Sequence, residues 1–282
     1  MKNQNRSDYT IKTTDKALTT ISKHANLNEP ETVKQFIANK QNVSEGYKKA
    51  LCIAYNKYCQ YYKIEWEMPL YKLATKIRRI PTTENIEKLI ARAGKTLSLK
   101  LRISKETGLR PIEIHMLKVK DIDTDQRTIY PTTAKNGSAR TLKISSNLSV
   151  TLQNHISTNK LNQNDKLFRG DAERYGKYYR QMRNSLAKKL NNQTLKTIRL
   201  YDFRHYYATR LYAKTRDILF VQQQMGHRQL RTTLIYVQLL NLNDDEWTCK
   251  TANNVTQATQ LIENGFEYVA EKDGTMLFRK RK

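Results

Sequence analysis

The chain has 282 residues and carries 51 lysines and arginines against 26 acidic residues, which gives a formal net charge of +25. Its length allows two domains and an appendage, and it argues against a single small domain. The charge is far larger than solubility requires, so we expect a polyanion as the partner, with a membrane surface as the competing choice.

The sequence shows no pattern typical of a membrane or secreted protein. Mean hydropathy is −0.76, and no stretch approaches the roughly 20 apolar residues that a membrane-spanning helix needs. The first ten residues lack the apolar core of a signal peptide. Three cysteines, Cys52, Cys59 and Cys249, predict neither a disulfide framework nor a metal site. We therefore expect a cytoplasmic protein with no membrane partner and no bound metal.

The N-terminal quarter of the chain is predicted to be helical. Residues 1–12 are polar and are expected to form a flexible N-terminus. Helical patterns near 13–24, 30–40 and 43–62 then predict a small helical domain over residues 13–75. Tyrosines recur along the third pattern, and we interpret them as core rather than as a stacking platform for bases. The same pattern carries three lysines that we expect to contact phosphate, namely Lys48, Lys49 and Lys57.

A short basic segment, residues 76–81, ends in proline and is predicted to be a linker. It contains Arg78 and Arg79, which we also expect to contact a polyanion. A second domain follows over residues 82–240, and helical patterns dominate it. One of its helices stops at Gly108, and the next begins at Pro111.

A hairpin is predicted to interrupt these helices. Strand formers at 128–130 and 141–144 flank Asn136-Gly137, a pair typical of a tight turn. Lys135 stands immediately before that turn. Helical patterns resume near residue 148.

One of the later helices is basic and aromatic, and it carries two further predicted phosphate contacts, Arg180 and Arg183. Residues 241–282 then alternate strand, helix, strand and strand patterns, which predicts a compact α+β appendage. This segment has six basic and seven acidic residues. Its near-neutral charge argues against contact with the expected polyanion and favours packing against a neighbouring subunit or its own domain.

Several separated residues suit a metal-free attack of a phenol on a phosphodiester. Arginine stays charged and grips two oxygens at once, which suits Arg110 and Arg204. Lys135, on a hairpin tip, is placed to protonate a leaving oxygen. Tyr236 follows His227 by nine residues and is the candidate nucleophile. Each of these residues alone is common at surface or core positions without a catalytic role. Only their combination points to this chemistry.

The combination resembles the tyrosine recombinase family of the integrase and Xer type, including some of its archaeal members. The matching motifs are TGLRPIE at 107–113, Lys135, DFRH at 202–205, MGH at 225–227, and Thr232-Thr233 with Tyr236. The resemblance implies a mainly α fold with a small β-hairpin. It consists of an N-terminal helical core-binding domain and a mixed, mostly helical catalytic domain.

The resemblance also implies roles for these residues. Arg110 and Arg204 would bind the scissile phosphate, and Lys135 would be the general acid. His227 would hydrogen-bond a non-bridging oxygen, and Tyr236 would form a 3′-phosphotyrosyl link. The resemblance also implies two supporting residues, Glu113 and His205. The alternative for Glu113 is an ordinary carboxylate on a helix surface, and His205 is expected to have a structural rather than a catalytic role. The implied partner is double-stranded DNA, held by a homotetramer that assembles from monomers or dimers, with no cofactor and no small-molecule substrate.

One departure from the family pattern bears on catalysis. The family usually has histidine three positions before the second arginine, where this chain has Tyr201. A neutral phenol is a poor base, so Tyr201 is expected to hydrogen-bond the phosphate instead. Two alternatives therefore stay open: a DNA-binding protein that has lost catalysis, and a type IB topoisomerase. Within the recombinase reading, the role is integration and excision of a mobile element or resolution of dimers, in a prokaryote, virus or plasmid.

Overall fold

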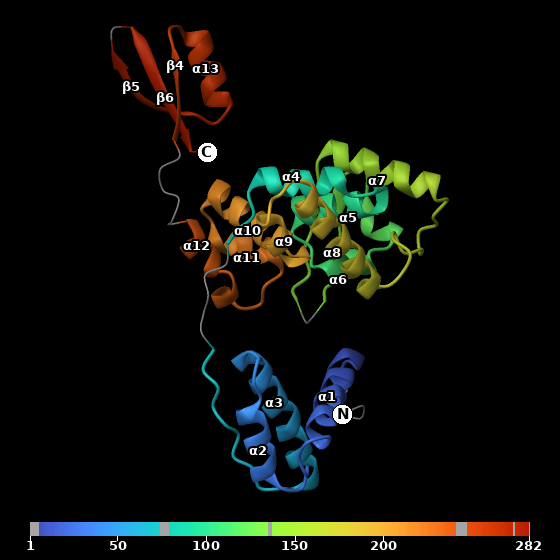
Figure 1. The fold of residues 1–282 in the computed structure, drawn as a ribbon. Helices are drawn as coiled ribbons and strands as arrows, with labels where there is room; N and C mark the ends of the chain where they lie inside the picture. Colours follow the sequence, from blue (N-terminus) through green and yellow to red (C-terminus); the bar gives the residue numbers. More distant parts are fainter. Residues whose placement is uncertain (1–5, 74–78, 135–136, 241–246, 273, 282) are drawn as a thin grey trace. The chain divides into compact units, whose positions relative to one another are not determined.

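The computed structural model divides the chain into two compact units, residues 1–77 and 78–282 (Figure 1). The division falls inside the segment expected to be a linker. The residues that the structure describes are 6–73, 79–134, 137–240, 247–272 and 274–281. Two predicted functional residues, Arg78 and Lys135, lie outside the described residues.

The first unit contains three helices, α1 (Asp8–Ser22), α2 (Pro30–Asn39) and α3 (Glu45–Tyr62). Helix α1 includes the last five residues of the segment expected to be flexible, and Ser7 caps it by accepting a hydrogen bond from the backbone N–H of Thr10. The core of this unit brings together apolar residues of all three helices, among them Ile21, Val33 and Ile37.

The tyrosines of α3 divide between core and surface. Tyr55 is fully buried and donates its hydroxyl to the carbonyl of Leu27. Tyr47, Tyr61 and Tyr62 are exposed. Interpreting the whole stripe as core is therefore wrong for the two tyrosines at its ends, Tyr47 and Tyr62.

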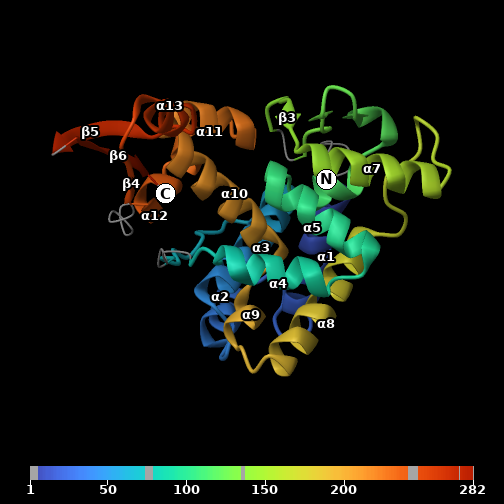
Figure 2. The same ribbon diagram turned by 90° about the horizontal axis from the view of Figure 1, so that it is seen from above.

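The second unit is mostly helical (Figures 1 and 2). Together with the three-helix first unit, it confirms the expected mainly α fold. Its longer helices are α4 (Thr83–Arg92), α5 (Lys95–Thr107), α7 (Ser146–Thr158), α8 (Ala172–Lys189), α10 (Leu200–Thr215) and α11 (Ile218–Met225). Its shorter helical segments are α6 (Pro111–Met116), η2 (Val119–Asp121), α9 (Thr194–Thr197), η3 (Leu230–Thr232) and α12 (Ile235–Leu240).

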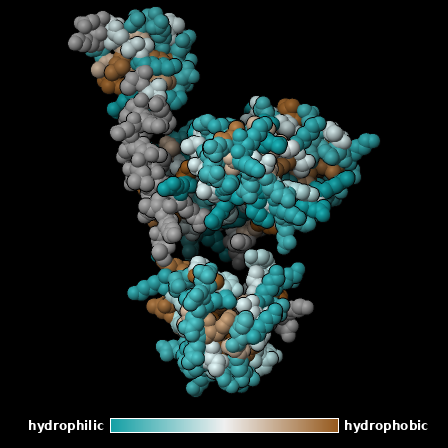
Figure 3. All heavy atoms as spheres, in the orientation of Figure 1, coloured by the Kyte–Doolittle hydropathy of each residue, from teal (hydrophilic) through white to brown (hydrophobic). Residues whose placement is uncertain are grey.

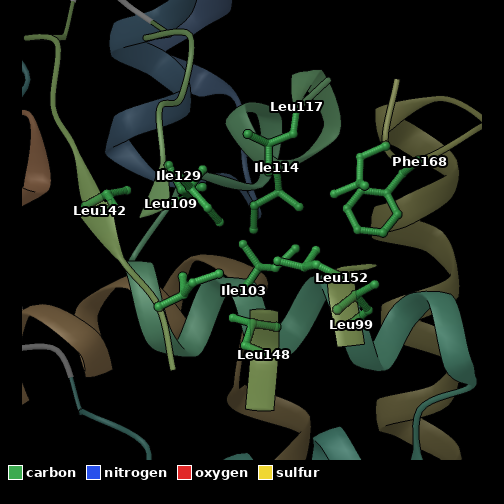
Figure 4. Close-up of a cluster of buried hydrophobic side chains, with 12 residues drawn as sticks. Leu99, Ile103, Leu109, Ile114, Leu117, Ile129, Leu142, Leu148, Leu152 and Phe168 are labelled. Carbon is green, nitrogen blue, oxygen red and sulfur yellow. The ribbon is translucent and has the colours of Figure 1, made fainter. Parts of the chain in front are cut away.

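Helix α5 lies at the centre of this unit, between two clusters of buried side chains. Leu99 and Ile103 of α5 face residues of α6 and α7 in the first cluster (Figure 4). Leu101 faces the second cluster, which contains Phe203 of α10. Because α5 ends at Gly108 and packs against α10, the arrangement brings the 107–113 segment close to the start of α10.

A small antiparallel sheet has the order β1 (Ile122–Asp123), β2 (Thr128–Ile129) and β3 (Leu142–Lys143). Ile129 pairs with Leu142, and the pairing goes no further toward the turn. This antiparallel pairing confirms the predicted hairpin. The predicted turn at Asn136-Gly137 includes Asn136, which lies outside the described residues. Gly137 donates its N–H to the carbonyl of Ala134.

The last segment forms the expected α+β appendage. Its elements are β4 (Trp247–Ala252), α13 (Val255–Glu263), β5 (Glu267–Lys272) and β6 (Thr275–Arg281). The antiparallel sheet has the order β4-β6-β5. Phe278 of β6 and Ala258 of α13 belong to its small core.

Hydrophilic side chains cover most of the described surface visible in Figure 3. Across the described residues, every helix is too short or too polar to cross a bilayer.

Candidate active site

The site begins where α5 ends and α6 starts. Gly108 adopts a left-handed conformation (φ +62°) that stops α5 and turns the chain into α6. Glu113, in the first turn of α6, accepts the backbone N–H of Arg110 at 2.9 Å and Nη1 of the same arginine at 2.7 Å. Glu113 is 1 % exposed, so the reading as a helix-surface carboxylate is wrong. The carboxylate therefore fixes both the backbone and the guanidinium of Arg110.

A third arginine, which sequence patterns did not single out, completes this arrangement. Arg140 precedes β3, and its Nη2 lies 2.7 Å from Oε2 of Glu113 with both side chains at 0 % exposure. Nε and Nη1 of Arg140 are buried and have no hydrogen-bond partner among the described residues. Glu113 thus lies between two guanidinium groups.

The electrostatics of Glu113 follow from this placement. Burial alone would raise the pKa of its carboxyl group. Arg140, the backbone N–H of Arg110 and the Arg110 guanidinium outweigh burial, and the pKa is lowered. Glu113 is therefore an anion at neutral pH.

Arg204 of α10 is fully buried and links three segments. Its Nη1 donates to the carbonyl of Gly108 at 2.7 Å, and its Nη2 donates to the carbonyl of Met225 at 2.5 Å. Nη2 also lies 3.0 Å from Nε2 of His227. Burial, and then the charge of Arg110, lower the pKa of Arg204 to about 10. It still carries its positive charge at neutral pH.

His227 follows the turn that ends α11. Its Nε2 accepts from Arg204, because a guanidinium has no acceptor atom, and its Nδ1 therefore carries the proton that it donates to Oγ1 of Thr233 at 2.9 Å. Burial, followed by the charges of Arg204, Arg110 and Arg140, lowers the pKa of His227 to about 3. The ring is neutral, and in this structure Nε2 is an acceptor rather than the phosphate donor that the sequence suggested.

The loop that carries Lys135 approaches the same cluster. The N–H of Ala134 lies 3.3 Å from Oε1 of Glu113. An ideal Cβ on Gly137 would lie 3.4 Å from Nη1 of Arg110 and 3.1 Å from the carbonyl of Gly226. The described residues on both sides of Lys135 therefore border the arginine cluster.

Three guanidinium groups and one carboxylate thus gather at one buried place, leaving an excess of two positive charges. An excess of buried cations is costly unless an anion joins it. Arg110 retains 11 % side-chain exposure, while the other two arginine side chains are inaccessible. The arrangement is suited to bind an anion such as a phosphate through Arg110 and to stabilise charge that develops on it.

Tyr236 lies beside this cluster but is not presented to solvent. Its ring is 1 % exposed and packs with Ala208, Val221 and Met225. Its hydroxyl lies 3.1 Å from Nδ1 of His205. The expected nucleophile is therefore held in the interior, next to a histidine that the sequence suggested to be merely structural.

The other predicted site residues have varied surroundings. Tyr201 is 39 % exposed, and its ring contacts that of His205 at 5.3 Å between centroids. Arg79 and Arg180 are exposed. Arg183 donates to the carbonyl of Ile198 at 2.7 Å and lies over the ring of Tyr179.

In the first unit, the lysines predicted to contact phosphate are partly buried. Lys48 donates to the carbonyl of Ala38, and Lys57 donates to the hydroxyl of Thr14. Lys49 lies on the same helix. The hydrogen bonds of Lys48 and Lys57 link α3 to α2 and α1, and contact of the three lysines with DNA stays a prediction.

Sequence reasoning missed two residues of the site, Arg140 and Thr233. Arg140 lies five residues after Lys135, in a loop where nothing in the local pattern marks burial. Thr233 was part of the matched motif but had no role assigned to it. Its complete burial and its bond to His227 supply that role.

Sequence comparisons identify the family and relatives of this chain. Residues 79–242 match the model of the phage integrase family. Tyrosine recombinase XerA of Saccharolobus solfataricus is 26 % identical over 189 residues, covering 67 % of this chain and 62 % of that protein. Tyrosine recombinase XerA of Pyrococcus horikoshii is 24 % identical over 193 residues, covering 68 % and 65 %. The chain therefore spans less than two thirds of the length of these curated relatives.

Solved structures share the fold. A lambda integrase dimer bound to a COC′ core site aligns with a TM-score of 0.62 at 12 % identity, covering 82 % of this chain and 89 % of the other. The Tn1549 transposon integrase in complex with transposon right end DNA aligns with a TM-score of 0.61 at 17 % identity, covering 82 % and 90 %.

Proposed function

Because the chain belongs to the phage integrase family, we propose that it is a site-specific tyrosine recombinase that cleaves and rejoins DNA through a 3′-phosphotyrosyl intermediate. The observation that carries this proposal is the buried cluster of Arg110, Arg140 and Arg204 around a single carboxylate, Glu113. Such a cluster is incomplete without an anion, and a backbone phosphate of DNA supplies one.

Each residue of the site has its own role in the proposed reaction. Arg110 and Arg204 bind the scissile phosphate and stabilise its charge in the transition state, a contribution whose loss typically costs about a hundredfold or more in rate. His227 joins them when its ring proton moves from Nδ1 to Nε2: Nε2 then donates to a non-bridging oxygen, and the hydroxyl of Thr233 donates to Nδ1. Lys135, next to residues that border Glu113 and Arg110, protonates the leaving 5′ oxygen. Tyr236 attacks phosphorus when the phosphate bound by these arginines reaches its hydroxyl.

Tyr201 contributes by hydrogen bonding rather than as a base. Its hydroxyl belongs to a residue that is 39 % exposed at the start of α10, one position from the capping Asp202. A neutral phenol donates readily but accepts a proton poorly at neutral pH. We assign it a hydrogen bond to the bound phosphate.

Positive charge in the second unit supports DNA as the partner. A cavity of about 630 Å³ lies between the start of α5 and the start of α8. Its lining includes five cationic side chains, Arg92, Lys95, Lys100, Arg169 and Arg174. The one acidic residue of that lining, Asp171, caps α8. Each phosphate of a polyanion that binds to this face releases counterions into solution, and this release favours binding.

A strand-exchange reaction requires two duplexes with two cleavages each, so the active assembly in this proposal is a homotetramer on DNA. The biological role is integration and excision of a mobile element or resolution of dimers. The appendage of residues 247–281 then serves contacts between protein segments rather than DNA binding. Deleting residues 243–282 tests that role, since intact cleavage and assembly in the shortened chain would exclude it.

The proposal is tested with a suicide substrate, a duplex nicked near the cleavage site so that the released strand diffuses away. We expect a covalent protein–DNA adduct with the wild-type chain and none with Tyr236→Phe. Exchange between two duplexes identifies a recombinase, whereas relaxation of supercoils by a monomer identifies a topoisomerase. Binding without an adduct in the wild type would show a DNA-binding protein that has lost catalysis.

A further inference from the structure

The replacement of the usual histidine by Tyr201 leaves the proposed reaction without an evident acceptor for the phenolic proton. The structure brings one histidine ring into direct contact with the nucleophile, since Nδ1 of His205 lies 3.1 Å from the hydroxyl of Tyr236. We propose that His205 is the general base that accepts this proton, an assignment that rests on the proposed function. His205 thereby takes over a task that the sequence at position 201 cannot perform.

Two features of the packing support this assignment. His205 lies one helical turn after Tyr201 on α10, and its ring contacts Tyr201 at 5.3 Å and Tyr236 at 5.8 Å between centroids. His205 is 4 % exposed and Tyr236 is 1 % exposed. Because bulk water does not reach this hydroxyl, the proton must pass to a protein group in contact with it, and His205 is such a group.

The charges around the pair favour loss of the phenolic proton. On α10 the next residue to His205 is Arg204, and His227 is close enough for His205 to contribute to its lowered pKa. Arg110 and Arg140 belong to the same cluster, with Glu113 as its carboxylate. A phenolate is stabilised by such cations, while a proton shared with His205 avoids placing a free hydroxide or hydronium in the interior.

The step balances within the residues named. The neutral imidazole carries its own hydrogen on Nε2 and accepts the proton of Tyr236 on Nδ1 as the Oη–H bond breaks. The Oη–P bond then forms and the P–O5′ bond breaks, and the leaving oxygen takes a proton from Lys135. In the rejoining direction, the O5′ hydroxyl returns its proton to Lys135, and the imidazolium of His205 returns the proton to Tyr236.

The test is single-turnover cleavage of the nicked substrate by His205→Asn. The Asn amide oxygen occupies nearly the position of Nδ1 and accepts a hydrogen bond, but it does not take up a proton. We expect the adduct to form about 10²-fold to 10⁴-fold more slowly, with DNA affinity unchanged. His155→Asn is the matched control, since His155 binds the carbonyl of Leu167 in another part of the unit. It should cleave at the wild-type rate.

A second measurement does not depend on any change at position 205. Incorporating 3,5-difluorotyrosine at position 236 lowers the pKa of the nucleophile itself. If His205 is the base, the rise of the cleavage rate with pH reports the pKa of the imidazole. It then occurs at the same pH in the wild-type and the fluorinated proteins. If the phenol ionises without a base, the rise of the rate shifts to lower pH together with the pKa of the fluorinated phenol, and the assignment of His205 fails. The same substitution should partly restore the rate of His205→Asn.

The outcomes separate this inference from the proposed function. A wild-type chain that forms no adduct removes the proposed function and leaves nothing for His205 to catalyse. A wild-type chain that cleaves, together with a His205→Asn variant of equal or higher rate, keeps the recombinase and overturns the base. In that case the hydrogen bond only holds Tyr236 in the interior.

Discussion

Glu113 and Arg140 form an ion pair from which solvent is completely excluded, with Oε2 and Nη2 2.7 Å apart and both side chains at 0 % exposure. The same carboxylate holds Arg110 at 2.7 Å through its other oxygen. Arg140 therefore fixes the group that fixes a phosphate-binding arginine. The pair connects the long loop before β3 to the first turn of α6.

Replacing Arg140 with methionine should lower the free energy of unfolding by about 1.5–3 kcal/mol, because Oε2 of Glu113 loses a buried hydrogen bond between charged groups. We also expect the cleavage rate to fall, since Glu113 would then be free to shift Arg110. Equilibrium denaturation and single-turnover cleavage measure the two effects. Lys88→Met is the control, because its pair with Glu84 lies on the surface and such pairs contribute less than about 1 kcal/mol. Equal losses in the two variants would contradict the structural role of Arg140.

The turn at Gly226 should not tolerate a side chain. Gly226 has φ +60°, and an ideal Cβ there would lie 2.5 Å from Nη1 of Arg140 and 3.0 Å from the carbonyl of Ser138. Gly226→Ala should therefore combine left-handed strain of about 1–2 kcal/mol with overpacking of about 1–3 kcal/mol. Cleavage should fall as well, because the next residue is His227.

Gly170→Ala provides the matched comparison for this variant. Gly170 also has a positive φ, +95°, but nothing lies within 4 Å of its ideal Cβ. It should show the backbone strain without the overpacking and without loss of cleavage. If both alanine variants lose the same stability and activity, contact between the Gly226 turn and Arg140 does not matter.

The arrangement of the site was predictable only in part from the sequence. Arg110, Arg204 and His227 stand in recognisable local motifs, and the structure brings them together because α5 packs on α10. The burial of Arg140 could not be predicted, because it depends on how a long loop folds over α6 and the Gly226 turn. The hairpin was predictable from the strand formers that flank Asn136-Gly137, since Ile129 pairs with Leu142.

The position of Tyr236 illustrates the same limit. Its spacing from His227 identified it as the candidate nucleophile, but spacing says nothing of which side of α12 faces the interior. Tertiary packing against Val221 and Met225 places the ring, and His205 binds its hydroxyl. The interpretation of His205 as merely structural could be revised only with this contact in view.

Stability should fall as the pH is lowered through the mildly acidic range, owing to His227. The folded-state pKa of this residue is about 3, and its unfolded-state value is near 6.5. Between these values the unfolded chain binds one more proton than the folded chain, so stability is present above about pH 6.5 and is lost as the pH falls toward 3. The slope due to this group is at most about 1.4 kcal/mol per pH unit.

Denaturant unfolding at pH 7 and at pH 5 measures this effect. His227→Gln should show a smaller loss between the two pH values than the wild type, because the glutamine does not titrate. A variant with an unchanged pH dependence would show that His227 is protonated as readily in the folded chain as in the unfolded one.

Arg180 and Arg183 of α8 should differ in what they contribute, although the sequence assigned both to DNA. Arg180 is exposed, so Arg180→Ala should weaken DNA binding and reduce the slope of log affinity against log salt concentration by about 0.9. Arg183 is partly buried and donates to the carbonyl of Ile198, which precedes α10. Arg183→Ala should therefore cost about 1 kcal/mol of folding stability through the lost hydrogen bond, with little change in the salt slope. Salt-dependent binding to a duplex and denaturant unfolding of both variants distinguish the two roles, and a salt slope that Arg180→Ala leaves unchanged would remove α8 from the proposed DNA interface.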